Sequence, residues 1–174
     1  MGSPVPDQLT LKHNRDREGK RELPWRRAGV VLIVAFLAAG LLNTFGQRPQ
    51  SSLAGVDEAT MKVYAPMRVR SGLFYEARFT IHALRELKDA NLVLSSGWLE
   101  GITLNTVEPS PIGESSRDGS PAFDLGHIPA GDKYILFLQF QVNPTNVGRR
   151  AQDVELYDGE RRLLTIHRRV TVFP

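Results

Sequence analysis

The sequence has no cysteine, and this absence removes several kinds of chemistry at once. Disulfide frameworks, thiolate metal sites and cysteine nucleophiles all need that residue. An oxidising compartment is still possible, because a domain of more than about 100 residues can bury enough apolar area without covalent cross-links. Any folded part must therefore be held together by packing and hydrogen bonds.

Motifs for catalysis and for metal binding are also missing. The chain contains no Gly-x-Ser-x-Gly elbow and no glycine-rich loop of the kind that cradles phosphate. Its four histidines are scattered singly, none at the short spacing of metal ligands, and no acidic stretch resembles an EF-hand calcium loop. We therefore expect no enzymatic activity, no cofactor and no metal.

Outside the first 27 positions there is no excess of basic charge. Positions 1 to 27 hold seven Lys/Arg and four Asp/Glu, which accounts for the whole net charge of +3, because the rest of the chain holds fifteen of each sign. A nucleic-acid-binding domain needs clustered basic charge. We therefore expect no nucleic-acid partner.

One stretch has no charge at all: AGVVLIVAFLAAGLLNTFG, positions 28 to 46. At ~1.5 Å per residue, a helix of this length spans roughly 28 Å, close to the thickness of the hydrocarbon core of a bilayer. No polar residue occurs between Ala28 and Leu42, whereas a core helix of a soluble protein has a polar side. The stretch predicts a transmembrane helix, with the lipid bilayer as its partner.

The flanking residues predict the orientation of this helix. Arg26 and Arg27 precede the apolar stretch directly, and only Arg48 follows it closely. Because short basic flanks stay in the cytoplasm, we expect a cytoplasmic N-terminus and an extracytoplasmic C-terminal domain in a single-pass protein of the cell membrane. Trp25 falls at headgroup depth, where an amphipathic ring is favoured.

Small residues near the end of the stretch allow two further interpretations. Ala38, Ala39 and Gly40 are of the kind that a signal peptidase accepts, so cleavage is an alternative to anchoring. The same three residues would let another helix approach closely, which predicts a helix-packing site in a larger membrane complex.

The sequence thus divides into four parts. We expect a flexible basic tail over 1–27, the transmembrane helix over 28–46, a tether over 47–60 and one folded domain over 61–174. The tether is predicted from its small, polar and turn-forming residues, which show no hydrophobic period.

In the last part the hydrophobic period becomes two. In LFYEARFTIHA (73–83) and KYILFLQFQVN (133–143), every second residue is apolar, which is typical of strands with one buried face. Ile135 and Phe137 lie on the opposite face of the second strand. Two apolar residues there suggest that other parts of the protein partly cover that face too. Further strands are expected at 61–65, 91–95, 100–107, 122–128, 153–157 and 161–173. About eight short strands without a helix predict an immunoglobulin-like (Ig-like) antiparallel β-sandwich.

The succession GLFYEARFTI, LKDANLVL and FDLGHIPAGDKYILFLQFQVN resembles the Ig-like repeats of bacterial surface proteins, including CARDB-like adhesion modules. Pro129, Ala130, Gly131 and Asp132 match the turn that precedes the long central strand in those families. The segment 85–88 departs from their pattern. The resemblance implies an extracytoplasmic module without catalysis, used in adhesion, in protein interaction or as an accessory subunit of a membrane complex.

Arg149 and Arg150 are the candidate contact residues, because they lie in a predicted loop and not along a strand. If the strands alternate up and down, loops 85–89, 108–121 and 144–150 all point toward the membrane. The two arginines would then face anionic headgroups or a membrane-protein or cell-envelope partner.

A different class of function is an alternative. In this alternative, Trp98 and the long connection 108–121 form a site for cell-wall glycans or another ligand. The domain would then be a ligand-binding or enzymatic ectodomain. An exposed Trp98 beside a carboxylate-lined cleft would favour this alternative, and a buried Trp98 would favour the interaction module.

Overall fold

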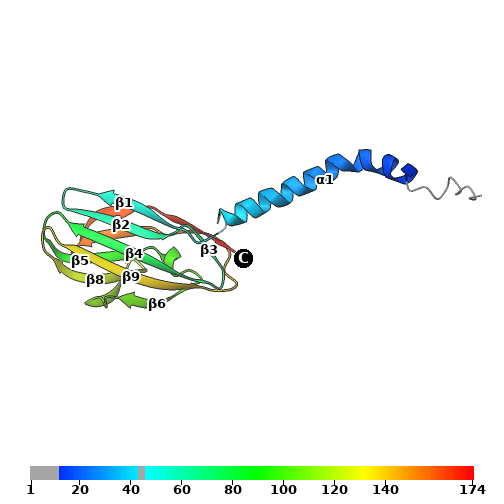
Figure 1. Cartoon of the computed structure of the whole chain (residues 1–174). Helices are drawn as coiled ribbons and strands as arrows, with labels where there is room; N and C mark the ends of the chain where they lie inside the picture. The colour runs from blue at the N-terminus through cyan, green and yellow to red at the C-terminus, as the bar shows by residue number, and fades with distance from the viewer. Residues whose placement is uncertain (1–11, 43–45) are drawn as a thin grey trace, which may run out of the picture. The chain divides into compact units, whose positions relative to one another are not determined.

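The computed structural model describes residues 12–42 and 46–174. The chain divides into two compact units, Met1–Phe45 and Gly46–Pro174. The first contains helix α1, and the second contains strands β1 to β13 (Figure 1).

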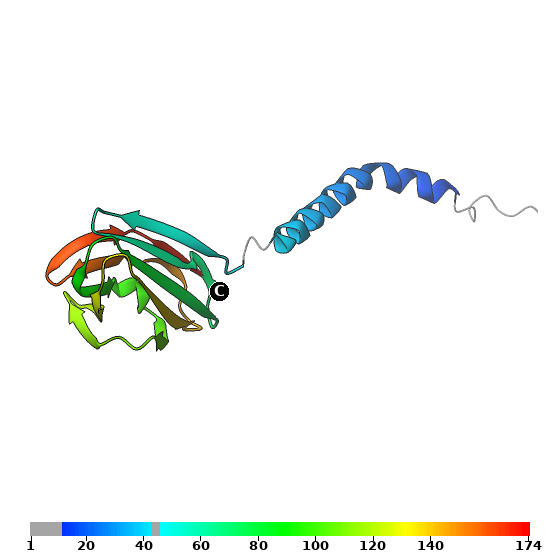
Figure 2. The same cartoon turned by 60° about the vertical axis from the view of Figure 1, so that its left-hand side comes forward.

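Helix α1 runs from Lys12 to Leu41. The predicted flexible tail over 1–27 is therefore helical from Lys12 onward, and positions 1–11 lie outside the described residues. Arg, Lys and Glu extend a helix readily once an apolar stretch has nucleated it, which explains the difference. Pro24 lies inside α1, where a proline removes a backbone hydrogen bond and bends the helix, and α1 is bent (Figure 2).

The part of α1 from Pro24 to Leu41 is long and apolar enough to cross a membrane. Its apolar side chains are exposed; Phe36, for example, is 72% exposed. A continuous apolar surface of this kind needs lipid or another apolar partner. The helix is thus compatible with a membrane span or a signal sequence, and positions 43–45 of the predicted span lie outside the described residues.

Most of the second unit consists of strands. They are β1 (Pro49–Gly55), β2 (Ala59–Pro66), β3 (Arg68–Arg70), β4 (Phe74–Ala83), β5 (Leu87–Leu94), β6 (Ile102–Glu108), β7 (Gly113–Arg117), β8 (Ser120–Ile128), β9 (Lys133–Val142), β10 (Gly148–Ala151), β11 (Val154–Asp158), β12 (Arg161–Ile166) and β13 (Arg169–Phe173). A short 3₁₀ turn, η2 (Ser96–Trp98), follows β5.

Two five-stranded sheets form the layers of a sandwich. Sheet A has the order β1-β2-β4-β9-β6, and sheet C has the order β12-β11-β5-β8-β7. Every second side chain is buried along β4, and along β9 from Leu136 to Val142, as the period of two predicts. Inward residues of both sheets fill the core, among them Phe79, Ile81, Leu138, Phe140, Leu92, Leu94, Phe123 and Leu156. The predicted Ig-like β-sandwich is therefore confirmed.

A third, small sheet closes one end of the sandwich. Sheet B has the order β10-β13-β3. Strand β13 pairs in parallel with β3, which brings Phe173 beside Arg70 although the two are far apart in the sequence. The side-chain amide of Gln47 lies between the Phe74 carbonyl on β4 and the Arg70 N–H on β3. Oriented with its nitrogen toward Phe74 (3.0 Å) and its oxygen toward Arg70 (3.2 Å), the amide bonds both groups and joins the start of this unit to sheets A and B.

Several connections predicted as loops contain strands. The predicted tether 47–60 contains β1, which pairs along β2 from Pro49 to Gly55. The connection 108–121 contains β7, and β10 begins within 144–150. These are edge strands of mostly small or polar residues, held by backbone hydrogen bonds, so they carry little hydrophobic period.

The expected simple alternation of strands is also wrong. The N–H of Leu84 bonds the carbonyl of Glu58, and the N–H of Ala83 bonds the carbonyl of Asp132. Loop 85–89 therefore lies with turn 129–132, at the end of the sandwich away from Gln47. By contrast, the Gly72 N–H bonds the Val142 carbonyl, so turn 71–72 and the loop after β9 share the Gln47 end.

Candidate functional site

Trp98 lies in the centre of the core and is 0% exposed. Its ring centroid is 5.5 Å from that of Phe79 and 5.4 Å from that of Phe140, both on sheet A. Its indole nitrogen donates to the backbone carbonyl of Asp153 (3.1 Å). Trp98 is therefore a packing residue, and the glycan-binding alternative loses the aromatic side chain on which it depended.

Two of the histidines, and the long connection 108–121, make contacts within the domain. His127 contacts Glu86 (2.9 Å), and His167 contacts Asp153 (3.1 Å). In the connection 108–121, Arg117 lies 4.3 Å above the ring of Tyr157. Over residues 12–42 and 46–174, no group of three or more His, Cys, Asp or Glu side chains could hold a metal ion.

Arg149 and Arg150, the candidate contact residues, point in different directions. Arg150 stands opposite Val170, on the inner face of sheet B. Its guanidinium pairs with Glu100 (3.1 Å) and donates to the side-chain oxygen of Asn146 (3.1 Å). Arg150 thus has a local ionic partner in the same domain, and its predicted contact with a membrane or partner stays a prediction. Arg149 is exposed, on the outer face.

Arg149 belongs to a larger basic surface that the sequence analysis missed. Strands β3, β10 and β13 contain five arginines and no Asp or Glu. Arg149 stands opposite Thr171, and Thr171 stands opposite Arg68, so all three share the outer face of sheet B. We call this surface the basic face; its exposed arginines are Arg68, Arg70, Arg149 and Arg169.

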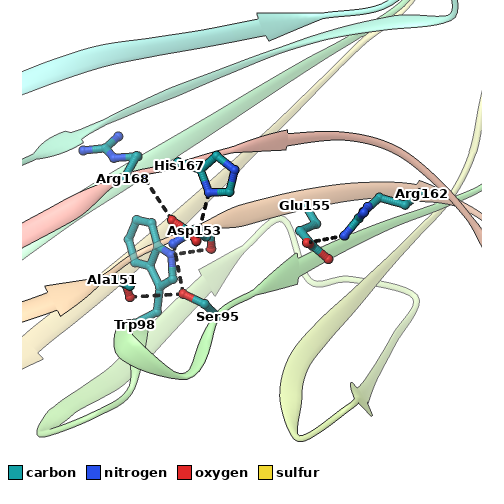
Figure 3. Close-up of polar contacts among 8 residues, drawn as sticks. All are labelled: Ser95, Trp98, Ala151, Asp153, Glu155, Arg162, His167 and Arg168. Atoms are coloured by element: carbon teal, nitrogen blue, oxygen red, sulfur yellow. Dashed lines mark hydrogen bonds and ion pairs between the residues drawn. The ribbon is translucent and has the colours of Figure 1, made fainter.

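The strands of the basic face are positioned by a set of polar contacts around Asp153 (Figure 3). Its carboxylate accepts from the backbone N–H of Arg168 (3.0 Å) and contacts His167. Its own N–H donates to the hydroxyl of Ser95 (2.9 Å), and that hydroxyl donates to the Ala151 carbonyl (3.1 Å). These contacts fix the two points where the chain crosses between sheet C and sheet B.

Arg168 is buried at one of these crossing points, with 3% of its surface exposed. Its guanidinium donates to the carbonyls of Val63 (3.2 Å) and Ala65 (2.7 Å) on β2, just before β3. Burial lowers the pKa of this guanidinium from its ordinary value. Arg168 thus ties β13 to the segment that leads into β3.

A second buried polar contact lies beside it. Gln152 is 1% exposed, and its amide nitrogen donates to the hydroxyl of Tyr75 (3.1 Å). Burial raises the pKa of Tyr75, and the hydrogen bond from Gln152 opposes this effect only in part. Because a buried amide and hydroxyl need partners, this pair fixes β4 against the crossing at Gln152.

A separate aromatic and cationic row crosses the outer face of sheet A. Tyr64 on β2 stands opposite Arg78 on β4, which stands opposite Phe137 on β9. The guanidinium carbon of Arg78 lies 5.2 Å from the Tyr64 ring centroid and 5.7 Å from that of Phe137. Ile135 and Phe137 remain 41% and 37% exposed, so the partial cover suggested by the sequence is not supplied within residues 46–174.

The predicted interface residues of α1 are placed on the helix as follows. Trp25 is 81% exposed, and Arg26 and Arg27 follow it on the exposed helix. Ala38, Ala39 and Gly40 lie in the last turn, and a side chain added at Gly40 would meet nothing within 4 Å. Their roles in topology and in helix packing stay predictions.

No protein-family model matches this chain, and no curated protein does. Among solved structures, it is similar to a cohesin module of a Clostridium perfringens family 33 glycoside hydrolase, at 14% identity and a TM-score of 0.40, covering 72% of this chain and 97% of that one. The CARDB domain of a Pyrococcus furiosus protein, in complex with di-metal ions, gives 13% identity and a TM-score of 0.39, covering 73% and 90%. The ASH / PapD-like domain 7 of human CEP192 is 13% identical with a TM-score of 0.34. The match covers 71% of this chain and 96% of that domain. These values assign no family.

Proposed function

We propose that this chain is a single-pass membrane-anchored interaction module. The helix holds it in the bilayer, with the N-terminus in the cytoplasm and the Ig-like domain outside. The domain binds a membrane-protein or cell-envelope partner and carries out no chemistry of its own. The exposed apolar part of α1 supports the anchor, and the half-buried row of Tyr64, Arg78 and Phe137 on the outer face of sheet A supports the interaction.

The row of Tyr64, Arg78 and Phe137 on sheet A is the observation that supports the proposed interaction. Arg, Tyr and other aromatic residues are enriched at the centres of protein interfaces, where they supply large contact area at low entropic cost. The Arg78 guanidinium, stacked between Tyr64 and Phe137, forms no ion pair with a carboxylate of the described chain. Its N–H groups are thus available to a partner's carboxylate or carbonyl oxygen.

Substitution of this row tests the interaction. The double variant Arg78→Glu/Phe137→Ser should keep the fold, because both side chains lie on the outer face of sheet A. We expect it to lower partner affinity at least about tenfold, the usual scale for central interface residues. The full chain, extracted in mild detergent, would be compared with the variant by native mass measurement.

The control introduces a glutamate on the opposite sheet. Ser115 is exposed on the edge strand β7, so Ser115→Glu should leave the complex intact. A defined complex that persists in the double variant would contradict the assignment to sheet A. A wild-type chain that is found only alone would contradict the interaction module itself.

A further inference from the structure

The basic face lies at the point where the domain continues toward α1. Gln47 bonds the backbone of both Arg70 and Phe74, so the chain leaves the domain directly beside β3. Between Leu42 and Gly46 there are four peptide units, which can extend over at most about 14 Å. Strand β1 occupies seven of the fourteen residues of the predicted tether, and β2 begins within the tether at Ala59.

The charge of the basic face is concentrated, because its three strands contain arginines and no Asp or Glu. Neighbouring strands lie about 4.8 Å apart, so Arg149 and Arg68, on either side of Thr171, are separated by about 10 Å at the backbone. This distance is close to the screening length of ~8 Å at physiological salt, so their charges act together on a nearby anion. Within the described chain, no ion pair is seen for the side chains of Arg70, Arg149 and Arg169.

An aromatic side chain lies on the same surface. Phe173 stands opposite Arg70 on the outer face of sheet B and is 36% exposed. An aromatic ring beside basic side chains suits the boundary between headgroups and acyl chains, where apolar and charged groups are both accommodated. Both the charge and the ring therefore fit a phospholipid surface.

We propose that the basic face binds the anionic phospholipid headgroups of the bilayer in which α1 is anchored. The inference rests on the proposed function, because it requires α1 to span that bilayer. Contact with the headgroups holds the domain with the Gln47 end against the membrane. The face of sheet A remains free for a partner, since its row belongs to a different sheet.

The absence of cysteine makes a direct test possible in the full chain. A single cysteine introduced as Thr171→Cys would carry a fluorophore at the centre of the basic face. The labelled chain is inserted into nanodiscs containing an acceptor-labelled lipid headgroup. The discs contain either phosphatidylcholine alone or a mixture of phosphatidylcholine and phosphatidylglycerol. We expect higher energy transfer in the anionic discs, and loss of the difference at high salt.

Charge-removal variants test the named arginines. The triple variant Arg70→Gln/Arg149→Gln/Arg169→Gln should reduce energy transfer in anionic discs to the level of the phosphatidylcholine discs. A basic residue near an anionic surface contributes roughly fivefold in binding, so three together should lower the docked-to-undocked ratio on the order of 100-fold. The control Lys62→Gln/Lys88→Gln/Lys133→Gln removes the same charge from sheets A and C and should change nothing.

Each outcome has one meaning. Equal energy transfer in both kinds of disc, or an unchanged signal in the arginine variant, overturns the headgroup inference and leaves the anchor intact. If the basic face instead binds an anionic partner protein, energy transfer should be equal in both kinds of disc, because lipid composition would not affect that binding. If the chain fails to enter nanodiscs at all, the proposed membrane anchor is wrong.

Discussion

Replacing Trp98 with alanine should lower the free energy of unfolding of the domain by about 3–5 kcal/mol, the usual cost of truncating a large core aromatic. The side chain is completely buried and packs against Phe79 and Phe140, so its removal leaves a cavity that these neighbours cannot fill. Total stabilities of single domains are about 5–15 kcal/mol, so this loss is a large part of the whole. Urea unfolding followed by far-ultraviolet circular dichroism measures it.

Trp98→Phe separates packing from hydrogen bonding. Phenylalanine keeps most of the ring but loses the indole N–H that donates to the Asp153 carbonyl. That carbonyl also accepts from the backbone N–H of Ser95 (3.0 Å), so it is not left without a partner. We expect a loss of only about 1–2 kcal/mol. A cost below about 1.5 kcal/mol for Trp98→Ala would contradict the central packing role.

The second large effect is a loss of stability at high pH caused by Tyr75. Burial raises the pKa of Tyr75 in the folded state above the unfolded value of 10. Stability from this group is therefore fully present below pH 10 and is lost as the pH rises toward the folded pKa. The slope is about 1.4 kcal/mol per pH unit for one group, so about 2–3 kcal/mol is lost between pH 10 and 12.

Tyr75→Phe should remove this contribution to the slope of the free energy of unfolding against pH. The variant should also be less stable at neutral pH by about 1–2 kcal/mol, because the Gln152 amide loses its acceptor. Tyr157 provides a comparison: a hydrogen bond to Glu155 raises its pKa near the surface, so Tyr157→Phe should change the slope less. Urea unfolding at pH 9, 10, 11 and 12 gives the slopes, and equal slopes for wild type and Tyr75→Phe would contradict the prediction.

The sequence predicted the central strands because their side chains decide their position. In β4 and β9 the strict alternation of apolar residues reflects one face turned to the core. The edge strands β1, β7 and β10 were missed because their side chains are largely exposed and show little hydrophobic period. The stretch 161–173 reads as one strand, but the chain changes sheets at Arg168, whose burial no composition argument would predict.

The basic face was beyond sequence reasoning for a topological reason. Arg149 could be predicted as a contact residue from the sequence, because it follows turn-forming residues and lies outside the alternating apolar pattern of the strands. Arg68 and Arg169 each look like an ordinary polar residue of a strand. They become neighbours only through the parallel pairing of β3 with β13, which joins segments about a hundred positions apart. Counting all charged residues after position 27 gave a net charge of zero, whereas the fold gathers basic residues on one sheet.

Retention of α1 in the mature protein tests the proposed anchor most directly. Membranes from cells expressing the full chain would be washed with alkaline carbonate, and the mass of the retained protein would be determined. The anchored module predicts that the intact chain, including Trp25 and Arg26, stays in the membrane fraction and that added protease digests the domain from outside. A shorter, released chain that begins after Ala39 or Gly40 would contradict the anchor and identify α1 as a cleaved signal sequence.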